Sequence, residues 1–218
     1  MKSLALHNES LSALTHLAGL LLSIAGLTLM VVFAALWGTA AHVIGFSIFG
    51  ASLILLYAVS SFYHFLSKRS KLKTLFQRLD HAMIFILIAG TYTPLALTMV
   101  QRGWGWSLFG IIWGLGMIGF LVKIMGFKMH NGISLPLYLG MGWLVLIALG
   151  PLTEWLKPQA LLWLALGGVL YTLGVLFYIL ESRVPRTRWL GMHEIFHLLV
   201  LGGSFSHFWL MLNHVLYA

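Results

Sequence analysis

Two histidines, His193 and His197, stand four residues apart in a stretch that is otherwise apolar. On a helix this spacing places both imidazoles on one face, where they can bind the same metal ion. His64 ends another apolar stretch and would supply a third nitrogen. Three protein ligands with an open fourth position are typical of catalytic zinc sites. Because the chain has no cysteine, imidazole ligands favour zinc, with iron, copper and nickel as alternatives. The sequence predicts a three-histidine Zn²⁺ site.

Two further polar residues accompany these histidines. Asp80 opens a third apolar stretch, and Ser60 lies one helical turn before His64. His64 and His193 each lie four or five residues from a basic residue of a loop, which is a depth of about 6–8 Å at 1.5 Å per residue. We predict that Asp80 accepts or relays a proton, or orients a ligand, and that Ser60 hydrogen-bonds a ring, a water or the substrate. Both are therefore candidate catalytic residues.

The elements that must position these residues are membrane-spanning helices. Of the 218 residues, 60% are hydrophobic and only 8% are charged, against about 25% charged in soluble domains. Runs of about 20 apolar residues predict spanning helices. They are Leu11–Trp37, Val43–Leu66, Ala82–Val100, Trp106–Val122, Ile133–Leu149, Leu161–Leu180 and Met192–Leu212. We expect an all-α bundle of seven transmembrane helices in one domain, residues 1–218.

The basic residues predict the orientation of this bundle. Only Arg102 and Lys157 fall on one side of the predicted spans. The other eleven are Lys2, Lys68, Arg69, Lys71, Lys73, Arg78, Lys123, Lys128, Arg183, Arg186 and Arg188. The positive-inside rule then places the N-terminus in the cytoplasm and the C-terminus outside. The basic side is expected to attract anionic lipid headgroups. No DNA- or RNA-binding pattern is present, so membrane lipids are the expected partners.

Several polar residues within the spans have competing interpretations. His16 and His207 serve either the function or hydrogen bonding between helices. The segment from His193 to His197 also matches the zincin protease pattern, with Glu194 as general base. The alternative for Glu194 is a carboxylate favoured by the dipole at a helix N-terminus. The many glycines of the fourth to sixth spans predict close helix packing.

Three motifs resemble the signatures of the progestin and adipoQ receptor family, with a closer match to its bacterial branch, the hemolysin III-like membrane proteins. They are Ser60-Ser61-Phe62-Tyr63-His64, Asp80-His81, and His193 with His197. The resemblance implies seven helices around a zinc ion held by the three histidines. It also implies that Asp80 bonds the zinc-bound water and that Ser60 lies nearby. Ser12 stands where this branch usually has asparagine, four residues before the first-span histidine.

The resemblance connects the chain to alkaline ceramidases, which hydrolyse lipid amides. We therefore expect a multi-pass protein of the bacterial inner membrane that acts as a zinc-dependent hydrolase of a membrane lipid amide. One alternative is a non-enzymatic sensor or regulator of the membrane with structural zinc. Another is a cytolytic protein, although no span carries the continuous polar stripe of a wide aqueous channel.

Overall fold

The computed structural model describes residues 2–127, 131–185 and 191–218, with the backbone alone for residues 2–10 and 131. Within these ranges every regular element is a helix, which confirms the all-α prediction. Lys128, Arg186 and Arg188 lie outside the described residues, as does the side chain of Lys2. The helices are α1 Lys2–Trp37, α2 Ala40–Phe65, α3 Lys73–Thr98, α4 Arg102–Ile124, α5 Asn131–Trp143, η1 Leu144–Ala148, α6 Leu149–Trp155, α7 Pro158–Leu180, α8 Met192–Asn213 and η2 Val215–Tyr217.

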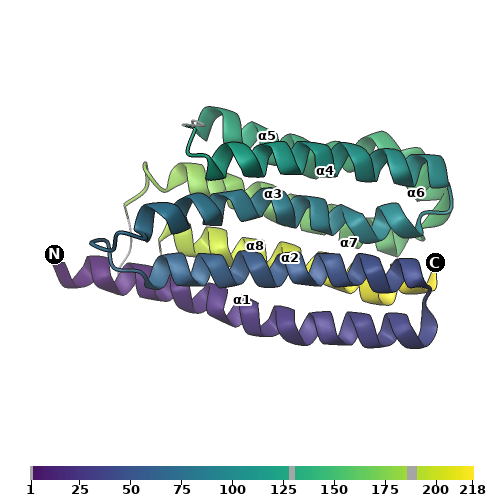
Figure 1. Ribbon diagram of the computed structural model, residues 1–218, viewed down its shortest axis with the longest axis horizontal. Helices are drawn as coiled ribbons and strands as arrows, with labels where there is room; N and C mark the ends of the chain where they lie inside the picture. Colours follow the sequence, from purple (N-terminus) through teal and green to yellow (C-terminus); the bar gives the residue numbers. More distant parts are fainter. Residues whose placement is uncertain (1, 128–130, 186–190) are drawn as a thin grey trace.

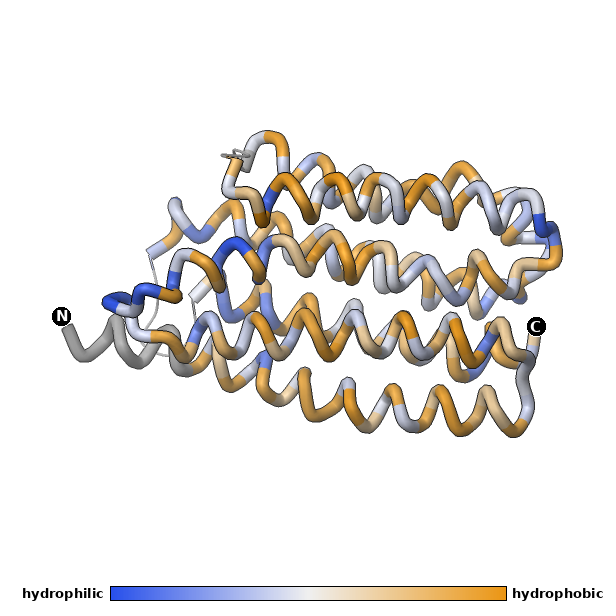
Figure 2. The backbone as a smooth tube through the Cα atoms, in the orientation of Figure 1, coloured by the Kyte–Doolittle hydropathy of each residue, from blue (hydrophilic) through white to orange (hydrophobic). Residues whose placement is uncertain are grey.

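The described residues contain seven segments that are long and apolar enough to cross a membrane. Their outer surfaces carry large aliphatic side chains, such as Leu22, Ile118 and Leu162, each more than 60% exposed. In water such exposure would be unfavourable, whereas hydrocarbon solvates these side chains. Hydrophilic residues gather toward the two ends of the bundle (Figure 2). The seven predicted spans are therefore present in the structure.

The helices lie side by side along the long axis of the molecule, with the two termini at opposite ends (Figure 1). Consecutive helices from α1 to α4 pack against one another, and α8 packs against both α1 and α7. This arrangement brings the start of α8 next to the end of α2, although about 130 residues separate them in sequence. The orientation of the bundle in the membrane stays a prediction.

The third span begins nine residues earlier than its apolar run predicts. Helix α3 starts at Lys73 rather than Ala82, and continues through Pro94 to Thr98. The first turns contain Lys73, Arg78 and Asp80, so hydropathy does not register them as part of a span. Asp80 therefore lies two turns inside a helix instead of opening one. A helix fixes the direction of its side chain more firmly than a loop would.

The fifth crossing is composite. Helix α5 changes to the 3₁₀ helix η1 at Leu144, and α6 completes the crossing to Trp155, six residues beyond the predicted end. The hydroxyl oxygen of Tyr92 lies 2.8 Å from the carbonyl oxygens of Met141 and Gly142, and it accepts the N–H of Val145 at 2.8 Å. Backbone groups freed inside a membrane need such partners. Tyr92 of α3 thus stabilises the break.

Candidate metal centre

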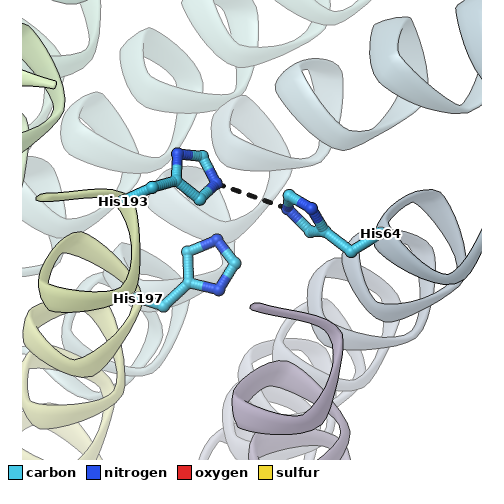
Figure 3. Close-up of side chains that lie close together, drawn as sticks. All are labelled: His64, His193 and His197. Atoms are coloured by element: carbon cyan, nitrogen blue, oxygen red, sulfur yellow. Dashed lines mark hydrogen bonds between the residues drawn. The ribbon is translucent and has the colours of Figure 1, made fainter. Parts of the chain in front are cut away.

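The three predicted histidines meet at one end of the bundle. His64 lies in the last turn of α2, and His193 and His197 lie in the first turns of α8. One ring nitrogen from each lies within 4.8 Å of the others. Figure 3 shows the rings of His64 and His193 directed toward each other, with their Nε2 atoms 3.4 Å apart. The predicted convergence of two distant segments is confirmed.

The spacing of these nitrogens suits a metal ion. Tetrahedral zinc with Zn–N bonds of about 2.0–2.1 Å holds its ligand nitrogens about 3.3–3.4 Å apart. The Nε2 atoms of His64 and His193 have this separation. The third imidazole, of His197, is buried beside them, its ring centroid 4.6 Å from that of His193 and 5.0 Å from that of His64. The donor set and its geometry fit zinc, although other metals that prefer imidazole would also fit.

Hydrogen bonds to the Nδ1 atoms of His193 and His197 fix the tautomer of both rings. In this tautomer Nδ1 carries the proton and Nε2 is free to bind a metal. The Nδ1 of His193 lies 3.0 Å from the Oε2 of Glu181. The Nδ1 of His197 lies 3.2 Å from the backbone oxygen of Ser12 and 3.1 Å from the hydroxyl of Thr15. A carboxylate or carbonyl oxygen can only accept, so each Nδ1 carries the proton. Each Nε2 then has a free lone pair, as in metal-bound histidines of other proteins.

Helix α1 supports the site through His16. Its ring stacks on that of His197, with the centroids 3.6 Å apart and the planes 12° from parallel. Its Nδ1 lies 2.7 Å from the Oγ of Ser60 on α2. Ser60 in turn interacts with the carboxyl group of Asp80 on α3. A line of polar groups, His16–Ser60–Asp80, therefore runs beside the three histidines. His16 bonds between helices, as one of its two interpretations predicts, and its contact with His197 places it beside the three-histidine cluster.

The carboxylate of Glu194 forms hydrogen bonds that stabilise the fold. Its Oε1 accepts the hydroxyl of Ser12 at 3.1 Å, and its Oε2 accepts the N–H of Gly191 at 2.8 Å. The side chain thus caps the N-terminus of α8 and ties that helix to α1, as the helix-dipole interpretation predicts. The zincin pattern would need this carboxylate beside the histidine cluster, whereas its two oxygens bond Ser12 on α1 and Gly191 at the start of α8. Ser12 is the residue that joins α1 to Glu194.

A long cavity begins beside the metal centre. It has a volume of about 240 Å³ and is enclosed mainly by apolar side chains of α3, α5, α7 and α8. His193, His197, Asp80 and Ser60 line one end, and Leu95 of α3 lines the other. Asp80 and Leu95 are fifteen residues apart on α3, which corresponds to about 22 Å. The cavity is therefore shaped for an elongated apolar molecule with a polar end at the histidines.

Sequence reasoning missed two contributors to this site. Glu181 holds His193, and Thr15 contacts His197. Glu181 had one usable signal, because it is one of only five acidic residues in the chain and directly follows an apolar run. Thr15 had no distinguishing signal, since a hydroxyl in a membrane helix commonly bonds its own backbone.

Known proteins are similar in sequence to most of this chain. The family model described as Haemolysin-III related matches residues 4–208. The chain is 39% identical over 208 residues to Hemolysin-3 of Bacillus cereus, covering 95% of this chain and 92% of the relative. It is 40% identical over 204 residues to a Hemolysin-3 homolog of Bacillus subtilis (strain 168), covering 94% and 92%.

A more distant similarity extends to an animal protein. The chain is 27% identical over 166 residues to the human Monocyte to macrophage differentiation factor, covering 74% of this chain and 66% of that protein. The family match spans residues 4–208, a range that includes His64, Asp80, His193 and His197. The chain belongs to the haemolysin-III related family, within the wider progestin and adipoQ receptor family.

Proposed function

We propose that the three histidines bind Zn²⁺ and that the protein is a zinc-dependent hydrolase of a membrane lipid amide in the bacterial cytoplasmic membrane. One observation carries the proposal: two members of the three-histidine cluster, His193 and His197, line a long apolar cavity whose wall also bears Asp80. A structural metal site needs no such cavity. A hydrolase acting on a lipid needs both the metal and a place for the chain.

Each residue then has a defined task. Bound zinc would supply Lewis acidity and activate water near neutral pH. Asp80 accepts the proton released in the reaction and passes it to the leaving nitrogen. Ser60 and His16 hold the Asp80 carboxylate in place, since they form a line that ends on it. Glu181 and the backbone of Ser12 hold His193 and His197 in their metal-binding orientation.

The cavity supports a lipid as substrate. Apolar side chains form its walls, among them Ile84, Leu87, Val175 and Val200. An acyl chain that moves from the bilayer into the cavity therefore stays in an apolar environment. The scissile carbonyl then lies at the polar end, between the histidines and Asp80. The predicted orientation, with the basic loops in the cytoplasm, places this chemistry beneath the inner surface of the membrane. Membrane lipids can enter sideways between helices without crossing water.

The test is to replace Asp80 with Asn and to measure fatty acid release from ceramide by the purified, zinc-loaded protein. General acid–base catalysis contributes about 10²–10⁴-fold to rate, so we expect Asp80→Asn to lower kcat by about 100-fold or more. Zinc content should stay unchanged, because Asp80 is not among the three ligands. Glu154→Gln, a change at the opposite end of the bundle, is the matched control. Equal turnover by the wild type and Asp80→Asn would contradict the mechanism.

A second candidate function is a membrane sensor or regulator in which zinc is structural. The observation in its favour is that the three histidines join α2 to α8, two helices far apart in sequence. In that case, removing zinc lowers the thermal stability of the protein, while no panel of lipid amides is turned over. Measuring turnover and melting temperature on the same preparation separates this function from the hydrolase.

A third candidate is cytolysis, which rests on the name of the Bacillus cereus relative, Hemolysin-3. Liposomes loaded with a fluorescent dye test it directly. Dye release that depends on the purified protein supports a cytolytic function, and liposomes that stay intact count against it.

A further inference from the structure

The apolar cavity follows one face of α3 over most of that helix. Five of its lining residues on α3 are Asp80, Ile84, Leu87, Thr91 and Leu95. They recur every three or four residues, which places them on the same side of a helix. The cavity therefore runs alongside α3 from the level of Asp80 to the level of Leu95, a distance of about 22 Å. A ligand that enters from the histidines has a path of defined length.

A wall closes the cavity at the end far from the histidines. Four residues line both the cavity and a second, much smaller void of about 10 Å³, namely Tyr92, Leu95, Val145 and Leu152. Since each borders both spaces, they lie between them. Leu95 of α3 and Leu152 of α6 are 4% and 1% exposed, so both are packed in the interior of the bundle. Two buried leucines from different helices thus contribute to the wall.

Polar side chains along the cavity bond to other parts of the protein. The indole N–H of Trp143 donates to the hydroxyl of Thr172 at 3.0 Å. The Nε2 of His207 lies 3.4 Å from the backbone oxygen of Leu164, and the backbone of the fifth crossing holds the hydroxyl of Tyr92. Apolar side chains form most of the remaining lining. Beyond its metal end, the cavity therefore suits a plain alkyl chain.

We infer that Leu152, together with Leu95, sets the longest acyl chain that the cavity accepts. The inference rests on the proposed function, in which the cavity holds the acyl chain of a lipid amide with its carbonyl at the histidines. An extended chain advances about 1.2 Å per bond, so a path of about 22 Å accommodates about 18 carbons. A longer chain presses its end against the two leucines. The substrates that fit are lipid amides with acyl chains up to this length.

The experiment compares two straight-chain saturated acids, stearate with 18 carbons and behenate with 22. The purified full-length protein, loaded with zinc, is incubated with equal amounts of both, and the bound acids are counted by native mass spectrometry. Forcing extra methylenes into a filled apolar space is unfavourable, so we expect the wild type to bind about tenfold less behenate than stearate.

Truncation of the wall should remove this discrimination. Leu152→Ala joins the cavity to the void behind it, and we expect the ratio of behenate to stearate to rise about tenfold above the wild-type ratio. Leu108→Ala is the matched control. Leu108 is 6% exposed and lines the smaller void, so its truncation enlarges that void and leaves the wall closed. Both variants lose a buried leucine side chain, but the ratio should change in Leu152→Ala alone.

The outcomes separate this inference from the proposed function. A wild type that binds both acids equally, or a ratio that stays unchanged in Leu152→Ala, overturns the role of Leu152 and leaves the acyl cavity standing. An equal rise in Leu108→Ala overturns it as well. If neither acid binds the wild type, the acyl cavity itself is wrong, and the inference falls with it.

Two further measurements keep the test decisive. Leu95→Ala opens the same wall from α3 and should raise the ratio in the same direction, so a poorly folded Leu152→Ala does not prevent a decision. Turnover of ceramide is measured on the same preparations. Length-dependent binding without any turnover supports the role of the two leucines and contradicts the hydrolase.

Discussion

At the scale of single residues, the site is defined by which nitrogen of each imidazole is engaged. His193 and His197 both direct Nδ1 to an oxygen acceptor, and their Nε2 atoms remain for a metal. The pattern of four-residue spacing predicts that the two rings share a face. It does not predict their tautomers, because Glu181 and the Ser12 carbonyl come from other helices. Contacts between distant segments decide this part of the chemistry.

Glu181→Gln tests the importance of the His193 orientation. The amide cannot replace the negative charge that stabilises the Nδ1 proton, so His193 becomes a weaker ligand. Loss of such a partner typically costs about 10–100-fold in metal affinity, and we expect a decrease in this range. Competition with a zinc chelator measures it, with Glu154→Gln as the control. Unchanged affinity would show that Glu181, whose side chain is 47% exposed, is only a surface neighbour of His193.

Glu194→Gln separates a helix cap from a general base. The amide oxygen can still accept one of the two hydrogen bonds, from Ser12 or Gly191, so we expect a loss of about 1 kcal/mol in stability. Zinc content and lipid amide turnover should stay within a few-fold of the wild type. Thermal unfolding and turnover are measured on the same sample. A 100-fold loss of turnover with zinc retained would instead support the protease-like role of Glu194.

At the scale of the helices, hydropathy predicts where spans lie but not how they begin or bend. The second, fourth, sixth and seventh spans agree with their helices to within a few residues, whereas α1 begins at Lys2, nine residues before its predicted span. The start of α3 and the break after α5 were not predicted. The first turns of α3 are too polar to count as a span, and the hydrogen bonds of Tyr92 have no effect on the hydropathy of α5.

The glycine content of a span predicts close helix packing only in part. A Cβ at Gly119 or Gly167 would meet a neighbouring helix, whereas one at Gly110 would contact nothing within 4 Å.

This difference between glycines predicts their tolerance to substitution. A Cβ at Gly105 of α4 would lie 2.2 Å from the backbone oxygen of Ala96 on α3, so the two helices must separate. Overpacking of this kind costs about 1–3 kcal/mol, and we expect Gly105→Ala to lower thermal stability accordingly. Gly110→Ala, on the same helix in open space, should be neutral or slightly stabilising. Equal effects of the two substitutions would contradict the observed α3–α4 contact.

At the scale of the whole molecule, the bundle has an apolar exterior, a three-histidine cluster at one end and a cavity lined in part by two of these histidines. The sequence predicted the seven-helix fold and the meeting of His64 with His193 and His197. Ionisable side chains within a membrane are unfavourable unless they have a polar partner, so histidines at similar depth are expected to lie together. It did not predict the cavity, because side chains of four helices distant in sequence, α3, α5, α7 and α8, line it together. The placement of His207 beside that cavity likewise emerges only from the packing of α7 against α8.

The central claim is that these three histidines bind one zinc ion. Elemental analysis of the protein purified from cells without added metal tests it most directly, with His64→Ala, His193→Ala and His197→Ala prepared in parallel. His42→Ala, at a buried histidine outside the cluster, is the control. We predict one zinc per chain in the wild type and in His42→Ala, and almost none in the three other variants. A wild-type protein without a transition metal, or zinc that remains bound in all three variants, would contradict the account.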